Sequence, residues 1–291
     1  LCLVPVFIYS QGDKTMTRNI SILSNDDIIE MAPAAGAWEP MEGVSSKYSF
    51  VPTVKAIDLL REVGWQPISA SQSGVRKAER NGYQKHLIRF AQPDLIMRDE
   101  RIDLLMYNSH DRGCSFKLMA GIFRFVCSNG LVVGDEYANF SHKHIGFSPD
   151  AFIQSAGKIA SAAGTIAERV DEMKVIEMSP DERGVFAQAA HSLIYDEPEQ
   201  APVQPNQLLD ERRYDDKGND LWTTFNVVQE NVMRGGLKGI SRGGDGRLRR
   251  TTTRPVKALD RNIKLNQALW FLTEKMAELK NVEGDPSTVS A

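Results

Sequence analysis

The sequence predicts an α+β fold, in which a long helix and further C-terminal helices pack on an antiparallel, β-containing core. Short runs rich in β-branched and aromatic residues, joined by short links, lie between residues 65 and 134. Apolar residues recur at helical spacing after residue 148. The 291 residues are 42% hydrophobic and 25% charged, which is typical of a globular chain with a sizeable core. We therefore expect one cooperative domain rather than a disordered chain.

Residues 1–47 are interpreted as an N-terminal arm, because MAPAAGAWEPMEGVSS is dense in proline and glycine. The opening LCLVPVFIYS is too short to span a bilayer, and it lacks the basic leader and the cleavage site of a signal peptide. MTRNIS from Met16 resembles a translational start, so residues 1–15 stay unassigned.

Residues 48–147 are predicted to form the β-rich core, which opens with a helix that ends at Gly64, a residue suited to a helix C-cap. Three segments with strand character follow, and their short links favour antiparallel pairing. CSFKLMAGIFRFVCSNGLVVG is predicted to form a strand around residues 122–126 after a short helical start. The predicted strand segments are 65–79, 83–91 and 101–109. The predicted apolar face of the helix holds Val54, Ile57 and Leu60.

Residues 148–280 are predicted to be helical. Ser148 suits the N-cap of a long helix, and Pro149 suits its first turn. SPDERGVFAQAAHSLIY repeats this start, with Ser179 and Glu182 at capping-box spacing. The long helix is expected to bury Ala156, Ile159, Ala163, Ile166, Val170 and Met173.

Two more helices are predicted beyond the proline-rich stretch DEPEQAPVQPNQ. NDLWTTFNVVQENVMRGG forms the first, which ends at Gly235 and Gly236. RPVKALDRNIKLNQALWFLTEKMAELK forms the second, and residues 281–291 form a frayed tail. The first is expected to bury Leu221, Phe225, Val228 and Val232. The second is expected to bury Leu259, Ile263, Leu269, Leu272, Met276 and Leu279.

A basic Gly-rich loop, residues 234–257, joins these two helices and is the most specific feature of the sequence. From Arg234 to Lys264 the chain holds ten Lys and Arg against two Asp, a local net charge of +8 in a chain of net charge −3. A solvated loop usually mixes signs, so this segregation predicts an anionic partner rich in phosphate. The predicted nucleic-acid-binding residues are Arg234, Lys238, Arg242, Arg247, Arg249, Arg250, Arg254, Lys257, Arg261 and Lys264.

Aromatic residues near this loop could offer faces on which bases stack. At helical spacing such residues more often belong to the core, so the assignment is a hypothesis for each of them. The candidates are Tyr214, Trp222, Trp270 and Phe271, of which we single out Trp222 and Trp270.

A polar cluster in NSHDRGCSFKL lies at the end of an apolar strand, where active sites often occur. His110 beside Asp111 resembles a base with its orienting carboxylate, but adjacent residues on a strand point to opposite faces. We therefore favour a turn in which Asn108 and Asp111 bond their own backbone. His142 and His144 share one face of a strand, yet two histidines without a third ligand predict no metal site.

The three cysteines form no paired framework and have no CxxC spacing, which favours a reducing bacterial cytoplasm. No phosphate-binding loop of the GxxxxGK[ST] type is present, which argues against ATP hydrolysis. No catalytic residue, metal or cofactor is predicted, and no membrane partner.

Two blocks of sequence resemble a known family, the phage/plasmid-like proteins catalogued as domain of unknown function 932. These blocks are YNSHDRGCSFKLMAGIFRFVCSNGLVVG and MRGGLKGISRGGDGRLRRTTTRPVKALDRNIKLNQALWFLTEKMAEL, and the resemblance spans residues 48–279. It implies a role in the DNA metabolism of a mobile element or in dealing with the host. It implies no catalytic residues.

The leading hypothesis is therefore a nucleic-acid-binding protein of a mobile element, which binds single-stranded DNA and promotes strand annealing or recombination as a homo-oligomer. If about six phosphates were neutralised, log affinity would fall with log salt at a slope near −4. Replacing Arg247, Arg249 and Arg250 with alanine is expected to weaken binding without unfolding the protein.

Two alternatives stay open, and the sequence leaves undecided whether the protein is an enzyme. One is a metal-dependent nuclease, although carboxylates that alternate with bases in QPDLIMRDERID are typical of an exposed hairpin. The other is an interaction module that binds a host factor. The nuclease candidates are Asp94, Asp99, Glu100, Asp103 and His110.

Overall fold

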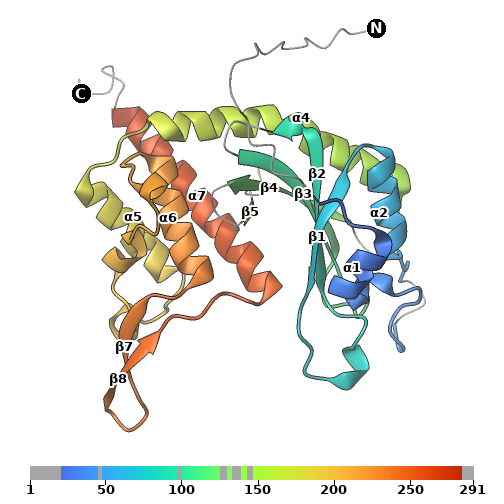
Figure 1. Cartoon of the computed structure of the whole chain (residues 1–291), viewed down its shortest axis with the longest axis horizontal. Helices are drawn as coiled ribbons and strands as arrows, with labels where there is room; N and C mark the ends of the chain where they lie inside the picture. The colour runs from blue at the N-terminus through green and yellow to red at the C-terminus, as the bar shows by residue number, and fades with distance from the viewer. Residues whose placement is uncertain are drawn as a thin grey trace, which may run out of the picture.

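The computed structural model describes residues 21–44, 48–96, 100–124, 130–132, 139–142 and 147–283. An antiparallel sheet lies beside a group of helices, and the long helix α4 runs along both (Figure 1). This confirms the predicted α+β class. The unassigned residues 1–15 and most of the predicted tail lie outside the described residues.

Helix α1 (Asn25–Met31) lies within the segment expected to be an arm, yet it contributes to the core. Ser24 begins it with a capping box, in which the Ser24 Oγ accepts from the Asp27 amide at 3.1 Å. Ile28 is fully buried and belongs to the main hydrophobic cluster. The Leu23 amide also donates to the Pro67 carbonyl at 2.8 Å, which ties the segment to the first strand.

Helix α2 (Thr53–Glu62) confirms the first predicted helix and its end. The Gly64 amide donates to the Arg61 carbonyl and the Trp65 amide to the Leu60 carbonyl, both at 3.0 Å. Gly64 has a φ of +91°, the left-handed conformation that this C-terminal motif requires. The predicted face of Val54, Ile57 and Leu60 is at most 9% exposed.

The main sheet is an antiparallel meander whose strands β1 to β4 pair in chain order. Its bounds are β1 (Gln66–Gln72), β2 (His86–Ile96), β3 (Glu100–Asn108), β4 (Phe116–Arg124), β5 (Gly130–Val132) and β6 (Asn139–His142). The last two both pair with β4. The three predicted strands are confirmed, although the first ends at Gln72, and the short helical start before residue 122 is wrong. Leu118 and Ala120 lie opposite Met106 and Leu104 of β3, so pairing and burial select a strand from Phe116 onward.

The two faces of this sheet are covered by different elements. Core residues such as Phe90 and Leu104 belong to one cluster with α1, α2 and α4. On the opposite face, Leu105, Tyr107 and Met119 pack against Ile263 at the start of α7. Figure 1 shows α2 and α7 on opposite sides of the sheet.

Helix α4 (Pro149–Val175) joins the sheet to the C-terminal helices. The Ser148 Oγ accepts from the Ala151 amide at 3.3 Å, which confirms the predicted N-cap. The predicted buried stripe from Ala156 to Met173 is confirmed and belongs to one hydrophobic cluster that extends from α1 to α7. No helix within the described ranges is long and apolar enough to cross a membrane.

The C-terminal helices are α5 (Pro180–Ser192), α6 (Leu221–Arg234) and α7 (Leu259–Glu283). The capping box of Ser179 and Glu182 is confirmed. Helix α6 is buried on nearly all sides rather than on one face, since only Thr223 between Leu221 and Met233 is not buried. Short 3₁₀ turns at Pro198–Gln200, Pro205–Leu209 and Tyr214–Asp216 fill the proline-rich connection before α6.

The predicted stripe of α7 is partly wrong. Ile263 and Leu269 are buried as expected, but Leu279 is 62% exposed. The buried line includes Asn266, because the Gln229 side chain of α6 donates to the Asn266 Oδ1 at 2.8 Å. Trp270, Thr273 and Ala277 continue this buried line, so the buried face of α7 differs from the one that hydrophobicity alone predicts.

A basic hairpin and the cavity at its base

The basic Gly-rich segment is a β-hairpin rather than an irregular loop. Its strands β7 (Lys238–Arg242) and β8 (Leu248–Thr252) pair antiparallel, from Lys238 opposite Thr252 to Arg242 opposite Leu248. Glycine and aspartate are depleted in strands, so the composition of this segment concealed the pairing. In Figure 1 the hairpin projects from the group formed by α5, α6 and α7.

The hairpin docks on the preceding connection through Gly239. The Ile240 amide donates to the Pro202 carbonyl at 2.8 Å. A Cβ atom added at Gly239 would lie 1.9 Å from the same Pro202 oxygen. Only a residue without a side chain permits this close approach, so the Gly239 side of the hairpin faces inward.

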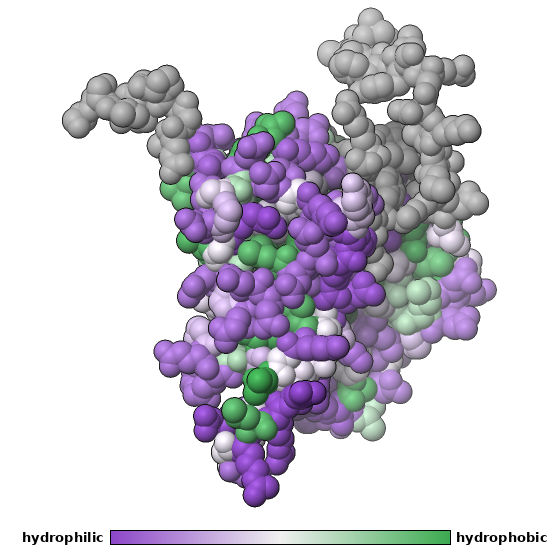
Figure 2. Space-filling view, turned by 60° about the vertical axis from the view of Figure 1, so that its left-hand side comes forward, coloured by the Kyte–Doolittle hydropathy of each residue, from purple (hydrophilic) through white to green (hydrophobic). Residues whose placement is uncertain are grey.

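The opposite side forms an outward surface that combines cations with aliphatic residues. Alternation along each strand and the register between strands place its members on one face. We call Lys238, Ile240, Arg242, Leu248 and Arg250 the outer face. Ile240 and Leu248 are 56% and 66% exposed. Figure 2 shows exposed apolar side chains at this end of the molecule, flanked by hydrophilic ones.

All ten predicted cations are exposed. Within the described ranges, only two of them lie at ion-pair distance from a carboxylate: Arg234 from Glu230 at 3.0 Å, and Arg249 from Asp245 at 2.8 Å. The other eight guanidinium and ammonium groups lie on the hairpin, on the segment after it and on the first turns of α7. Their charge is therefore available to an external anion.

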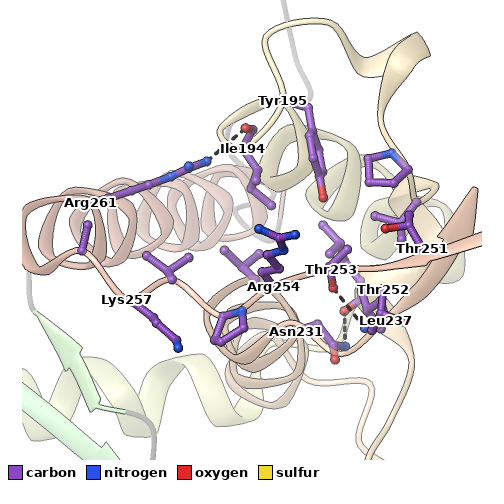
Figure 3. Close-up of a pocket in the computed structure, with 17 residues that line it drawn as sticks. Ile194, Tyr195, Asn231, Leu237, Thr251, Thr252, Thr253, Arg254, Lys257 and Arg261 are labelled. Atoms are coloured by element: carbon purple, nitrogen blue, oxygen red, sulfur yellow. Dashed lines mark hydrogen bonds between the residues drawn. The ribbon is translucent and has the colours of Figure 1, made fainter. Parts of the chain in front are cut away.

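A cavity of about 500 Å³ lies at the base of the hairpin. The segment 253–258 borders it and crosses the end of α6, where the Val256 amide donates to the Met233 carbonyl at 2.9 Å. Gly235 allows this crossing, because a Cβ atom there would lie 2.7 Å from the Arg254 backbone. Three of the predicted cations line the cavity, namely Arg254, Lys257 and Arg261 (Figure 3).

The prediction that Trp222 and Trp270 stack with bases is wrong. They are 4% and 0% exposed, and their rings make an edge contact at 6.5 Å between centroids. The Trp222 Nε1 donates to Glu100 at 2.8 Å, which satisfies its one polar group in the core. The other two aromatic candidates, Tyr214 and Phe271, are exposed.

The NSHDRG segment forms the predicted turn, since the Asn108 and Asp111 side chains accept from the Ser109 and Gly113 amides, both at 2.8 Å. Sequence reasoning missed that His110 would be buried beside His86. No sequence pattern marked this pair, because the two histidines come together only through the pairing of β2 with β3.

The two histidines share one hydroxyl in the core. The Thr53 Oγ1 lies 2.8 Å from the His86 Nε2 and 3.0 Å from the His110 Nε2, and all three residues are fully buried. The His86 Nδ1 faces the Gln84 carbonyl at 3.0 Å, so this nitrogen carries the proton and the Nε2 accepts from Thr53. Burial lowers the pKa of His86 to about 4. This cluster fastens the start of α2 to the sheet.

The candidate nuclease carboxylates are occupied by internal partners where the structure describes them. Glu100 is 1% exposed and accepts from Trp222 and from Lys174 at 2.9 Å. Asp103 is fully buried and accepts from Arg101 at 2.5 Å. Burial raises the pKa of Asp103, although its arginine neighbours oppose that shift. The described residues contain no group of His, Cys, Asp and Glu that could hold a metal ion.

The remaining candidates lie outside what the structure describes. They are Asp99 and the side chains of Asp94, His142 and His144.

Comparisons with known proteins identify similar sequences over most of the chain. The family described as "Domain of unknown function (DUF932)" matches residues 40–270, which include the sheet, the hairpin and much of α7. The chain is similar to the UPF0380 proteins YfjQ and YafZ of Escherichia coli strain K12. Each is 32% identical over 265 residues, which cover 91% of this chain and 95% of the relative. No solved structure gives a significant match.

Proposed function

Since the chain belongs to the DUF932 family, we propose that it is a nucleic-acid-binding protein of a mobile element and binds single-stranded DNA through the basic hairpin. The observation that carries the proposal is the set of ten exposed cations, eight of which have no carboxylate at ion-pair distance within the described ranges. Cations that form no ion pair with a carboxylate can neutralise phosphates and release their counterions, which is a large source of affinity for nucleic acids.

The outer face favours a single strand over a duplex. Lys238, Arg242 and Arg250 share this face with the exposed Ile240 and Leu248. A single strand offers both phosphates and unpaired bases, whereas the bases of a duplex are stacked inside it. Aliphatic side chains between cations therefore suit unpaired bases.

We expect the triple variant Lys238→Ala, Arg242→Ala, Arg250→Ala to bind a single-stranded oligonucleotide more weakly than the wild type. Loss of three phosphate contacts lowers the slope of log affinity against log salt by about 2 for a single strand. The measurement is fluorescence anisotropy over a series of salt concentrations. The fold is expected to persist, because the three side chains are exposed.

A matched control removes three exposed cations from the sheet side, as Lys55→Ala, Arg76→Ala, Lys77→Ala. It makes the same change in net charge and is expected to keep the wild-type slope. Equal slopes in the hairpin variant and the wild type would contradict the proposal, and so would a wild type whose affinity ignores salt.

Arg249→Ala and Arg250→Ala are expected to differ, although the residues are adjacent. Arg250 lies on the outer face, while Arg249 lies on the other face and pairs with Asp245. We expect the Arg250 variant to lose more affinity in the same anisotropy assay. If Arg249→Ala lost more affinity than Arg250→Ala, the bound DNA would cross the opposite face of the hairpin. This refines the expectation for the combined replacement of Arg247, Arg249 and Arg250 by alanine.

We further propose that several copies assemble along one strand and promote annealing of complementary strands. Mass photometry with and without an oligonucleotide tests the assembly, and the pairing rate of labelled complementary strands tests the annealing. A monomer whose mass is unchanged by DNA, together with an unchanged pairing rate, would contradict this part of the proposal.

A further inference from the structure

We propose that the cavity at the base of the hairpin holds one nucleotide, with its phosphate against Arg254 and Arg261 and its base against Tyr195 and the aliphatic wall. The inference rests on the proposed function where the nucleotide is part of a bound strand. A free nucleotide has the same chemistry, and the experiment below separates the two sources.

The size and position of the cavity fit a small ligand. Its volume of about 500 Å³ lies within the range of roughly 300–1,000 Å³ that is usual for small-molecule sites. Four parts of the chain build it: the segment after α5, the end of α6, strand β8 with the segment after it, and the start of α7. Strand β8 borders the cavity and also carries Arg250 of the outer face. A single-stranded DNA that crosses the outer face therefore passes close to the cavity.

The charge of the lining selects an anion. Arg254, Lys257 and Arg261 line the cavity, and no carboxylate of the described residues does. Within the described ranges Arg254 and Lys257 make no ion pair, and Arg261 donates only to the Ile194 carbonyl, at 3.4 Å. Guanidinium groups bind phosphate oxygens with two parallel hydrogen bonds, so two arginines at one cavity favour a phosphate.

The rest of the lining favours a ligand that is larger than an inorganic ion. Aliphatic side chains form much of the wall, which a phosphate alone does not need. They are Ile194, Val203, Leu208, Val232, Leu237 and Val256. An anion with a flat apolar part fits this wall, and a nucleotide has that composition.

Tyr195 is placed to contact a base. Its ring lies 4.7 Å from the ring of His191, whose Nε2 donates to the Val203 carbonyl at 2.9 Å. The buried His191 therefore fixes the position of the tyrosine. In Figure 3 the Tyr195 and Arg254 side chains point into the same space, Arg261 reaches toward Ile194, and Lys257 points away from Tyr195. Burial raises the pKa of the Tyr195 hydroxyl and the positive charge of Arg261 opposes this shift, so the tyrosine and the arginine act on each other across the cavity.

The test compares an oligothymidylate with a strand of equal length that carries abasic sites, since both have the same charge. We expect the wild type to bind the strand with bases roughly tenfold more tightly. Tyr195→Leu is expected to reduce this ratio, whereas Arg254→Gln is expected to weaken the binding of both strands, because both keep the phosphate. Tyr214→Leu and Arg250→Gln are the matched controls outside the cavity and are expected to keep the ratio. The second part of the test is a titration of the protein with thymidine monophosphate, in which calorimetry measures the binding.

Each result decides a separate question. A ratio that falls in Tyr195→Leu and persists in the controls supports a nucleotide of the bound strand. If the ratio does not change, saturable binding of the monophosphate that Arg254→Gln abolishes supports a free nucleotide. If the protein binds single-stranded DNA but shows neither the fall in the ratio nor saturable binding of the monophosphate, the cavity assignment is wrong and the proposed function still holds. Absence of strand binding overturns the proposed function, and the monophosphate titration then decides the cavity alone.

Discussion

Replacing Gly239 with alanine is expected to lower the free energy of unfolding by roughly 1–3 kcal/mol, as overpacking in a closely packed site does. The added Cβ would lie 1.9 Å from the Pro202 oxygen and 3.0 Å from the Val203 side chain. The first of these is a backbone atom, so a change of rotamer cannot relieve the clash. The hairpin must move away from Pro202, which breaks the Ile240 hydrogen bond and opens one wall of the cavity.

The effect on binding follows from the same displacement. We expect Gly239→Ala to bind single-stranded DNA more weakly even though it removes no charge. Denaturant unfolding measures the stability, and hydrogen exchange at the Ile240 amide reports the docking directly. Gly244→Ala is the matched control, because Gly244 lies in the turn of the same hairpin with nothing within 4 Å of an added Cβ. Equal stability of the two variants would show that the hairpin does not depend on Pro202 for its position.

Stability is expected to fall by about 3 kcal/mol as the pH decreases from about 6.5 to 4, because of His86 alone. The unfolded chain binds a proton at His86 near pH 6.5, whereas the folded protein, with a pKa of about 4, stays neutral in this window. The stabilisation is therefore fully present above pH 6.5 and is lost as the pH falls to 4. Thr53, the Gln84 carbonyl and His110 surround the ring, and Asp111 is the charged group that partly opposes the shift.

His86→Gln tests this assignment through the slope of stability against pH rather than through the stability at one pH. The variant is expected to be less stable at neutral pH, because the buried hydrogen bonds are disturbed. Its stability should change less between pH 6.5 and 4.5 than that of the wild type. The Glu182 carboxyl acts at lower pH: hydrogen bonds from Lys280 and Ser179 lower its pKa to about 2, so it affects stability only below about pH 4.5. Identical slopes in the variant and the wild type above pH 4.5 would exclude His86 as the cause.

The sequence located helix ends with accuracy because the interactions that make them are local. Ser148, Ser179 and Gly64 each act on a backbone group a few residues away, so type and spacing suffice. The buried stripe of α4 was likewise visible in its periodicity. The cations between α6 and α7 could be counted from the sequence. Their exposure could also be expected, because charged side chains are costly to bury.

The sequence by itself determined the fold class, most helix boundaries and the place of the basic segment, since these depend on neighbours within a few residues. Tertiary structure alone decided the rest. It buried Trp222 and Trp270, joined Thr53, His86 and His110, pressed Gly239 against Pro202 and enclosed the cavity. Each of these contacts joins parts of the chain that are distant in sequence, and which of them meet is set by how whole helices and strands pack. No local pattern carries that information.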